Sequence, residues 1–207
     1  MNDMFYYVVR AICWLIFKIC WKIDVVGIEN VPKEGGLILA SNHVSYLDPI
    51  VLAITMKRKI YFITKKEAFN NIFGNILLTN LNAFPVDREK IDIHSLKKSL
   101  EILQEKKVLG IFPEGTRSKN GELQELKLGI IKIAIKTGVP ILPVGIMGTH
   151  KIYSHGKVFP TLFKYNISVC YGPLQYFDQE KMGDKIYQKE ALNILGQKIK
   201  QLTNSHI

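Results

Sequence analysis

The chain has 207 residues, of which 28 are lysine or arginine and 18 are aspartate or glutamate; its net charge is +10, and 47% of its residues are hydrophobic. This length suits one domain with a real core, and the apolar content excludes an intrinsically disordered chain. Three sparse cysteines exclude a disulfide framework and favour a reducing compartment. A basic excess combined with a slightly positive mean hydropathy indicates nucleic acid or, more readily, an anionic membrane as partner.

The apolar residues are concentrated at the start of the chain, in residues 4–23. Three cations interrupt this segment, at Arg10, Lys18 and Lys22. A spanning helix needs about 20 predominantly apolar residues, and this segment reaches that length only by including the cations. We therefore expect residues 1–23 to form a membrane-interfacial helix with its basic residues near lipid phosphates, and residues 24–207 to form the main domain. A buried core helix with extended lysine stems is the main alternative.

After this segment, short β-type runs alternate with helical patterns. Strands are expected at the apolar runs 24–28, 37–41, 60–64, 108–112, 141–147 and 167–172. Helices are expected from Asp48-Pro49 onward, behind Asp92 over residues 93–103, over about 126–136 with a stop at Gly138, and over about 184–202. This alternation predicts an α/β fold: a single domain with a mixed, mostly parallel sheet flanked by helices. Ligands of such sheets bind beyond the carboxyl ends of the strands.

The first polar cluster follows the run 37–41 and contains His43 and Asp48. A loop that folds back brings the carboxylate to the imidazole, where it would fix the tautomer and stabilise the imidazolium of a general base. No serine or cysteine nucleophile in a recognised elbow stands near, so the base is expected to activate a substrate hydroxyl. On these two residues alone, a structural interpretation is equally good: Asp48 caps the following helix and His43 is a loop residue.

The second polar cluster follows the run 108–112 and contains Glu114 and Arg117. The guanidinium fork of Arg117 suits bidentate binding of a phosphate, and Glu114 is a candidate to hold Arg117 or a substrate hydroxyl. Lys65 and Arg88 are further cations at predicted strand ends, where they fit a phosphate monoester. Each of them taken singly is better explained as a surface charge.

Together these residues resemble the glycerolipid acyltransferase family, in particular the bacterial lysophosphatidic acid acyltransferases. The Asn-His, four residues, Asp motif of the family is matched by Asn42, His43 and Asp48. Its Phe-Pro-Glu-Gly-Thr-Arg-Ser motif is matched without change by residues 112–118, and its fourth motif by residues 139–144. The second motif is matched at Lys65, Glu67 and Arg88, and it departs from the family pattern at Ala68, Ile72, Asn75 and Asn82.

The resemblance implies that His43, oriented by Asp48, deprotonates the free sn-2 hydroxyl of 1-acyl-glycerol-3-phosphate. The alkoxide then attacks an acyl thioester of coenzyme A or acyl carrier protein, and phosphatidic acid forms directly, without an acyl-enzyme, a metal or another cofactor. The residues implied in substrate binding are Lys65, Arg88, Glu114, Gly115, Thr116 and Arg117. The implied setting is phospholipid biosynthesis at the cytoplasmic face of the cell membrane, with membrane lipid, lysophosphatidic acid and the acyl donor as partners of a monotopic protein.

Three other functions are weighed against this one. A sibling enzyme that acylates glycerol-3-phosphate or another lysophospholipid shares the same motifs. A non-catalytic basic protein bound to anionic membranes explains the charge but not four correctly ordered motifs. Nucleic-acid binding lacks a recognisable signature. Outside the motifs, His150 is the remaining histidine closest to a predicted strand end, and the apolar residues of the loop 149–163 are candidates to wall an acyl tunnel.

Overall fold

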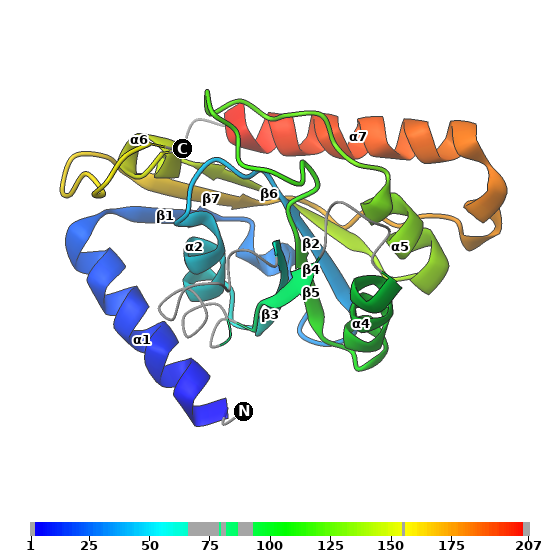
Figure 1. Cartoon of the computed structure of the whole chain (residues 1–207), viewed down its shortest axis with the longest axis horizontal. Helices are drawn as coiled ribbons and strands as arrows, with labels where there is room; N and C mark the ends of the chain where they lie inside the picture. Colours follow the sequence, from blue (N-terminus) through cyan, green and yellow to red (C-terminus); the bar gives the residue numbers. More distant parts are fainter. Residues whose placement is uncertain (1–2, 66–78, 80–81, 87–92, 155, 205–207) are drawn as a thin grey trace.

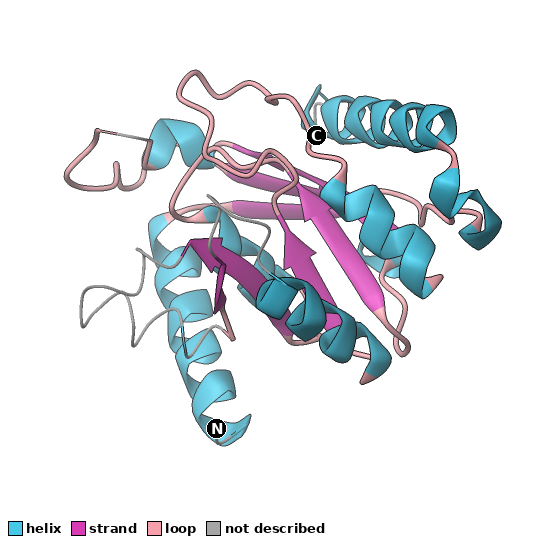
Figure 2. Ribbon diagram, turned by 45° about the vertical axis from the view of Figure 1, so that its right-hand side comes forward, coloured by secondary structure: helices cyan, strands magenta, loops and turns pink. Residues whose placement is uncertain are grey.

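A computed structural model describes residues 3–65, 79, 82–86, 93–154 and 156–204 of the chain. A central twisted sheet is covered by helices on both faces (Figures 1 and 2). The helices of the described residues are α1 (Asp3–Cys20), α2 (Asp48–Thr55), α4 (Ile93–Gln104), α5 (Gly129–Thr137), α6 (Thr149–Ile152) and α7 (Lys185–Asn204). Helices α1 and α2 cover one face of the sheet, and α4, α5 and α7 cover the other.

Over the described residues, seven strands form one sheet. They are β1 (Ile23–Val26), β2 (Leu37–Ser41), β3 (Ile60–Lys65), β4 (Phe84–Val86), β5 (Val108–Ile111), β6 (Ile141–Met147) and β7 (Ile167–Tyr171). Their order in the sheet is β1-β7-β6-β2-β5-β3-β4, and every neighbouring pair is parallel except β6 with β7. The prediction of an α/β domain with a mixed, mostly parallel sheet is therefore confirmed.

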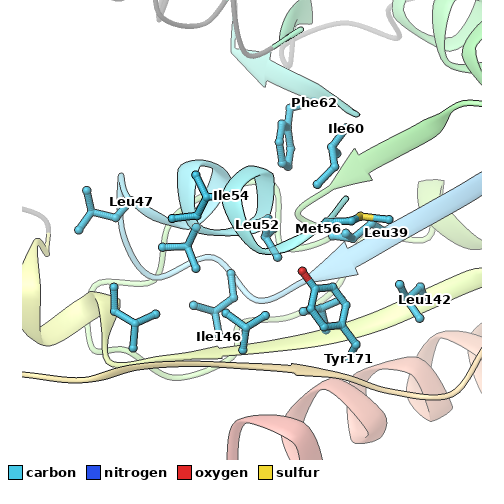
Figure 3. Close-up of a cluster of buried hydrophobic side chains, with 14 of the residues drawn as sticks. Leu39, Leu47, Leu52, Ile54, Met56, Ile60, Phe62, Leu142, Ile146 and Tyr171 are labelled. Atoms are coloured by element: carbon cyan, nitrogen blue, oxygen red, sulfur yellow. The ribbon is translucent and has the colours of Figure 1, made fainter. Parts of the chain in front are cut away.

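The strand β2 lies in the middle of this sheet and is buried on both faces. Leu37 and Leu39 contribute to the core beneath α1 and α2, whereas Ile38 and Ala40 contribute to the core beneath α5 and α7. All four side chains are fully buried, as the two-residue period of a covered strand requires. The first of these cores is drawn in Figure 3, where α2 lies against the sheet. This burial fixes the point at which β2 ends and its polar loop begins.

Most of the predicted boundaries lie within one or two residues of the observed ones. Three differences from the prediction affect the description of the fold. The first strand ends at Val26 and not at residue 28, because Gly27 adopts a left-handed φ of 73° before a short 3₁₀ turn. Residues 84–86 form a strand, which was not among the expected strand runs although Arg88 was placed at a strand end. The helix expected from about residue 126 begins at Gly129, and it ends at Gly138 as predicted, where φ is 66°. Asp92 lies outside the described residues.

Helix α1 presents two different apolar faces. Tyr6, Phe17 and Trp21 are buried against the domain. A second row of side chains, Val8, Ile12, Leu15 and Ile19, is between 49% and 64% exposed. The helix is therefore not a fully buried core helix, which was the main alternative for this segment.

Arg10 on α1 contacts the end of α2. Its guanidinium donates to the backbone oxygens of Ile54 (3.5 Å) and Lys57 (3.4 Å) at the carboxyl end of α2, where the helix dipole favours a cation. The expectation that the cations of this segment lie near lipid phosphates stays a prediction. Among the described helices, none has both the length and the apolar content needed to cross a membrane.

Candidate active site

The loop after β2 folds back on itself and brings His43 to Asp48. The Nδ1 atom of His43 lies 2.9 Å from Oδ2 of Asp48, and the same oxygen accepts the backbone N–H groups of Val44 and Ser45, each at 2.7 Å. Asp48 is fully buried at the first position of α2, and Leu47 is the N-cap residue. The interpretation of Asp48 as a helix cap is therefore wrong, because its carboxylate turns back toward the loop that precedes the helix.

The second oxygen of Asp48 is also occupied, by a residue that the sequence analysis missed. The hydroxyl of Thr149 donates to Oδ1 at 2.7 Å, and Thr149 is fully buried at the start of α6. Thr149 is two residues beyond β6, which is the neighbour of β2 in the sheet. The signal that marks it in the sequence is a hydroxyl residue directly after a strand, and only the strand order assigns it to Asp48. The carboxylate thus accepts four hydrogen bonds if Nδ1 of His43 carries a proton.

The imidazole of His43 is held between this carboxylate and an aromatic ring. The ring of Phe112 stacks on it with 4.0 Å between centroids and 17° between planes, and Phe62 in turn stacks on Phe112 with 5.8 Å between centroids. With Nδ1 turned to Asp48, the Nε2 atom is the nitrogen left for another partner. The His43 side chain is 16% exposed, so the imidazole is fixed in orientation and still reached from outside. This arrangement is that of a general base.

Glu114 holds the backbone of the same loop in place. Its Oε1 atom accepts the backbone N–H of His43 at 2.6 Å, and its Oε2 atom accepts that of Gln124 at 2.8 Å. The backbone N–H of Ser118 donates to the carbonyl oxygen of His43 at 2.8 Å. Because both oxygens of Glu114 are engaged by backbone donors, the geometry gives this residue a positioning role, and its expected contact with substrate stays a prediction.

Burial has a measurable effect on Glu114. The residue is 3% exposed, and burial raises the pKa of its carboxyl from 4.5 to about 7 although the two backbone hydrogen bonds act in the opposite direction.

The backbone contacts of this loop explain why α5 starts later than expected. The segment before it is held in an extended path, with the N–H of Gln124 on Glu114 and the N–H of Lys127 on the carbonyl oxygen of Pro113.

Arg117 offers an unused hydrogen-bond donor beside this loop. Its guanidinium lies flat on the ring of Tyr46, with 3.4 Å between the carbon Cζ and the ring centroid. Its Nη1 atom is buried and has no hydrogen-bond partner within the part of the chain that the structure describes. A buried cationic donor without a partner is costly, and an oxyanion beside it would supply the missing acceptor.

A further cation, Lys127, lies against the turn that carries Arg117 and was not singled out in the sequence. The side chain of Lys127 rests on Gly115, where an added Cβ would lie 2.9 Å from Nζ. Gly115 has a φ of 73°, which a residue with a side chain rarely adopts. Thr116 is exposed at the tip of this turn. The turn therefore combines one guanidinium, one ammonium and an open hydroxyl.

The remaining predicted site residues fall at the edge of the described structure. Lys65 is the last residue of β3, on the same side of the sheet as the loops after β2 and β5. Arg88 lies outside the described residues, as do Glu67 and most of the second motif. His150 contacts the loop after β2, with Nδ1 3.3 Å from the carbonyl oxygen of Val44. No group of three or more metal-ligating side chains was found among the described residues.

Three comparisons with known proteins bear on this site. An acyltransferase family model matches residues 22–147. The chain is 33% identical to the 1-acyl-sn-glycerol-3-phosphate acyltransferase of Bacillus subtilis over 193 residues, 92% of each chain. It is also 33% identical to the enzyme of the same name from Borreliella burgdorferi over 173 residues, 83% of this chain and 67% of the relative.

A solved structure shows the same fold. The crystal structure of the 1-acyl-sn-glycerophosphate (LPA) acyltransferase PlsC from Thermotoga maritima matches with a TM-score of 0.74 at 23% sequence identity, covering 100% of this chain and 86% of that one. The resemblance drawn from the ordered motifs is thereby confirmed, and the structure places the residues of two of those motifs in contact. The chain belongs to the acyltransferase family.

Proposed function

We propose that this chain transfers a fatty acyl group from a thioester to the sn-2 hydroxyl of 1-acyl-glycerol-3-phosphate, giving phosphatidic acid. The contact between His43 and Asp48 carries the proposal: the carboxylate of Asp48 is buried, whereas the imidazole of His43 is still partly exposed. The names of the relatives that match most of this chain support the substrate. The thioester is that of acyl-coenzyme A or acyl carrier protein.

The proposed mechanism uses His43 first as a base and then as an acid. Nε2 takes the proton of the substrate hydroxyl while Asp48, bonded to Nδ1, stabilises the imidazolium that forms. The hydroxyl oxygen attacks the thioester carbonyl, a new C–O bond forms, and the C–S bond breaks as the tetrahedral intermediate collapses. The leaving thiolate takes the proton from Nε2, which returns His43 to its neutral form. The reaction needs no covalent acyl-enzyme, and no electron transfer is involved.

The phosphate of the acceptor would be bound at the turn after β5. The Nη1 atom of Arg117, which has no hydrogen-bond partner among the described residues, supports this assignment because a phosphate oxygen would give it an acceptor. Gly115 and Thr116 would contribute the shape of the turn and a hydroxyl, and Lys65 and Arg88 further positive charge. Glu114 would act on the loop backbone, as its two hydrogen bonds indicate.

The same proposal assigns residues 1–23 to membrane association and residues 24–207 to the catalytic domain. The exposed apolar row of α1 supports an interfacial helix that lies in one leaflet, and we expect the cytoplasmic face of the cell membrane. This location brings the enzyme to lysophosphatidic acid, which is itself a membrane lipid.

The purified full-length chain tests the reaction directly. It is incubated with labelled 1-acyl-glycerol-3-phosphate and either acyl-coenzyme A or acyl carrier protein, and phosphatidic acid is measured. Parallel reactions contain glycerol-3-phosphate or lysophosphatidylcholine in place of the acceptor. Formation of phosphatidic acid with one donor supports the proposal and identifies that donor. Turnover only with another acceptor, or with none, contradicts it.

A further inference from the structure

The loop between α6 and β7 exposes a group of large apolar side chains. Val158 is 77% exposed, Phe159 80%, Leu162 47% and Phe163 71%. All four side chains are exposed, and the expectation that this loop walls an acyl tunnel stays a prediction. A soluble surface rarely presents four neighbouring apolar side chains, and such a patch marks an interaction site.

The backbone of this loop is strained in a way that keeps one aromatic side chain outside. Phe163 has a φ of 57°, which is a genuine outlier for a bulky residue. Its N–H donates to the carbonyl oxygen of Cys20 at 3.1 Å. Packing of the ring in the core does not repay the strain because the ring is exposed. Strain of this kind persists where function requires the conformation.

The loop is attached to the carboxyl end of α1. Besides the bond between Phe163 and Cys20, the indole N–H of Trp21 donates to the carbonyl oxygen of Thr161 at 2.9 Å. In Figure 1 the loop, in yellow, lies beside this end of α1. A cleft of about 810 Å³ opens at the junction and is lined by Trp14, Ile19 and Phe163 among others. The exposed loop residues thus continue the apolar row of α1.

The charges around this combined surface are mostly positive. Residues 149–166 contain three lysines and no acidic residue, and Lys18 and Lys22 lie in the last part of the apolar segment, where Lys22 pairs with Asp24 at 3.1 Å. Apolar side chains flanked by lysines suit an anionic lipid surface, in which rings enter the acyl region while ammonium groups stay at the phosphates. A protein partner with an apolar patch would not require this mostly positive charge.

We propose that residues 156–164 form a second membrane-inserting element, which enters an anionic lipid monolayer beside the exposed face of α1. This inference rests on the proposed association of α1 with the membrane. The carbonyl oxygen of Tyr153, just before the loop, accepts the hydroxyl of Ser45 at 2.6 Å, and the N–H of Thr161 donates to Ile152 at 2.9 Å. Since Ser45 belongs to the loop that carries His43, insertion sets the position of the catalytic base relative to the lipid surface.

Depth-dependent quenching tests whether the loop enters the bilayer. Phe159→Trp and the control Tyr176→Trp, a site that is 71% exposed, are compared on phosphatidylcholine–phosphatidylglycerol vesicles with brominated acyl chains. The control site and the loop lie at opposite ends of β6. Tyr176 follows Gln175, which pairs with Ile141 at the start of β6, whereas residues 156–164 come after the end of β6. After subtraction of the parent signal from Trp14 and Trp21, the tryptophan at 159 is expected to be quenched and that at 176 to be unaffected.

Binding to the same vesicles, measured by sedimentation, gives the second test. Phe163→Gly removes the ring and also relieves the strained backbone, so the variant is expected to fold at least as stably and to bind roughly tenfold more weakly. Tyr176→Gly, the matched control, is expected to bind as the parent does. Equal quenching at 159 and 176, unchanged binding of Phe163→Gly, or a parent chain that does not bind vesicles would each overturn the proposal. None of these measurements requires turnover, so the acyl-transfer reaction, assayed with short-chain substrates in solution, stands or fails separately.

Discussion

Replacing Glu114 with glutamine separates the electrostatic role of this side chain from its positioning role. The carboxylate is buried and accepts two backbone N–H groups, those of His43 and Gln124. Its pKa rises from 4.5 to about 7 on folding because burial disfavours the charge more than the two hydrogen bonds favour it. Ionisation is therefore harder in the folded chain than in the unfolded one. The free energy of unfolding of wild type falls as the pH rises toward and through 7. The glutamine variant lacks this pH dependence because its side chain at position 114 has no ionisable group.

The size of the effect follows from the two pKa values. Between about pH 5 and pH 8, proton linkage reduces the free energy of unfolding of wild type by roughly 2 to 3 kcal/mol relative to Glu114→Gln. Urea unfolding at the two pH values measures this difference, and the slope with denaturant is expected to be the same in both proteins. Glu122→Gln, which changes an exposed carboxylate in the same segment, is the control and is expected to shift stability by less than about 0.5 kcal/mol.

The same substitution is expected to weaken catalysis. An amide has only one acceptor oxygen, so in either orientation its NH₂ group meets one of the two backbone donors. The loop that carries His43 then loses a fixed contact, and we expect kcat for acyl transfer to fall roughly tenfold. A free energy of unfolding that differs between the two proteins by the same amount at pH 5 and pH 8, together with equal activity, would refute the reasoning: burial would then not dominate at this carboxyl, and the two hydrogen bonds would not position the base.

Three further substitutions probe the catalytic pair and the anion site. His43→Ala is expected to reduce kcat roughly 10²–10⁴-fold with the fold intact, whereas the exposed His94→Ala has no effect; equal turnover of the two variants would exclude His43 as the base. Thr149→Val removes the hydroxyl bonded to Asp48 and is expected to lower kcat roughly tenfold at constant KM, and a change in KM alone would place Thr149 in binding instead. Arg117→Lys keeps the charge but loses the fork, so the KM for the acceptor is expected to rise roughly tenfold; normal acceptor kinetics would remove Arg117 from the phosphate site.

The sequence was most informative where the determinants are local. Continuous apolar runs predicted β2 and β6 to the residue, because strands buried on both faces end where polar residues begin. The pairing of His43 with Asp48 was predicted as one of two equal interpretations, since both residues sit in one short loop. The ordered motifs then favoured the catalytic interpretation.

The features that sequence alone did not reveal depend on which strands are neighbours. Thr149 reaches Asp48 because β6 lies beside β2, and Glu114 reaches the backbone of His43 because β5 lies on the other side. Neither adjacency follows from spacing along the chain. The late start of α5 has the same origin, because Gln124 and Lys127 form backbone hydrogen bonds to the loop after β5.

The contact between Arg10 and the end of α2 has a consequence for how the enzyme is built. One end of this eight-residue helix receives the guanidinium from α1, and the other end carries Asp48. At about 1.5 Å per residue, α2 is a rigid spacer of roughly 10 Å between its contact with α1 and the carboxylate of Asp48. The length of α2 therefore sets the distance between Asp48 and the contact with α1. A single inserted residue would turn one end of α2 by about 100° relative to the other, so that Asp48 and the contact with Arg10 would no longer be aligned as they are.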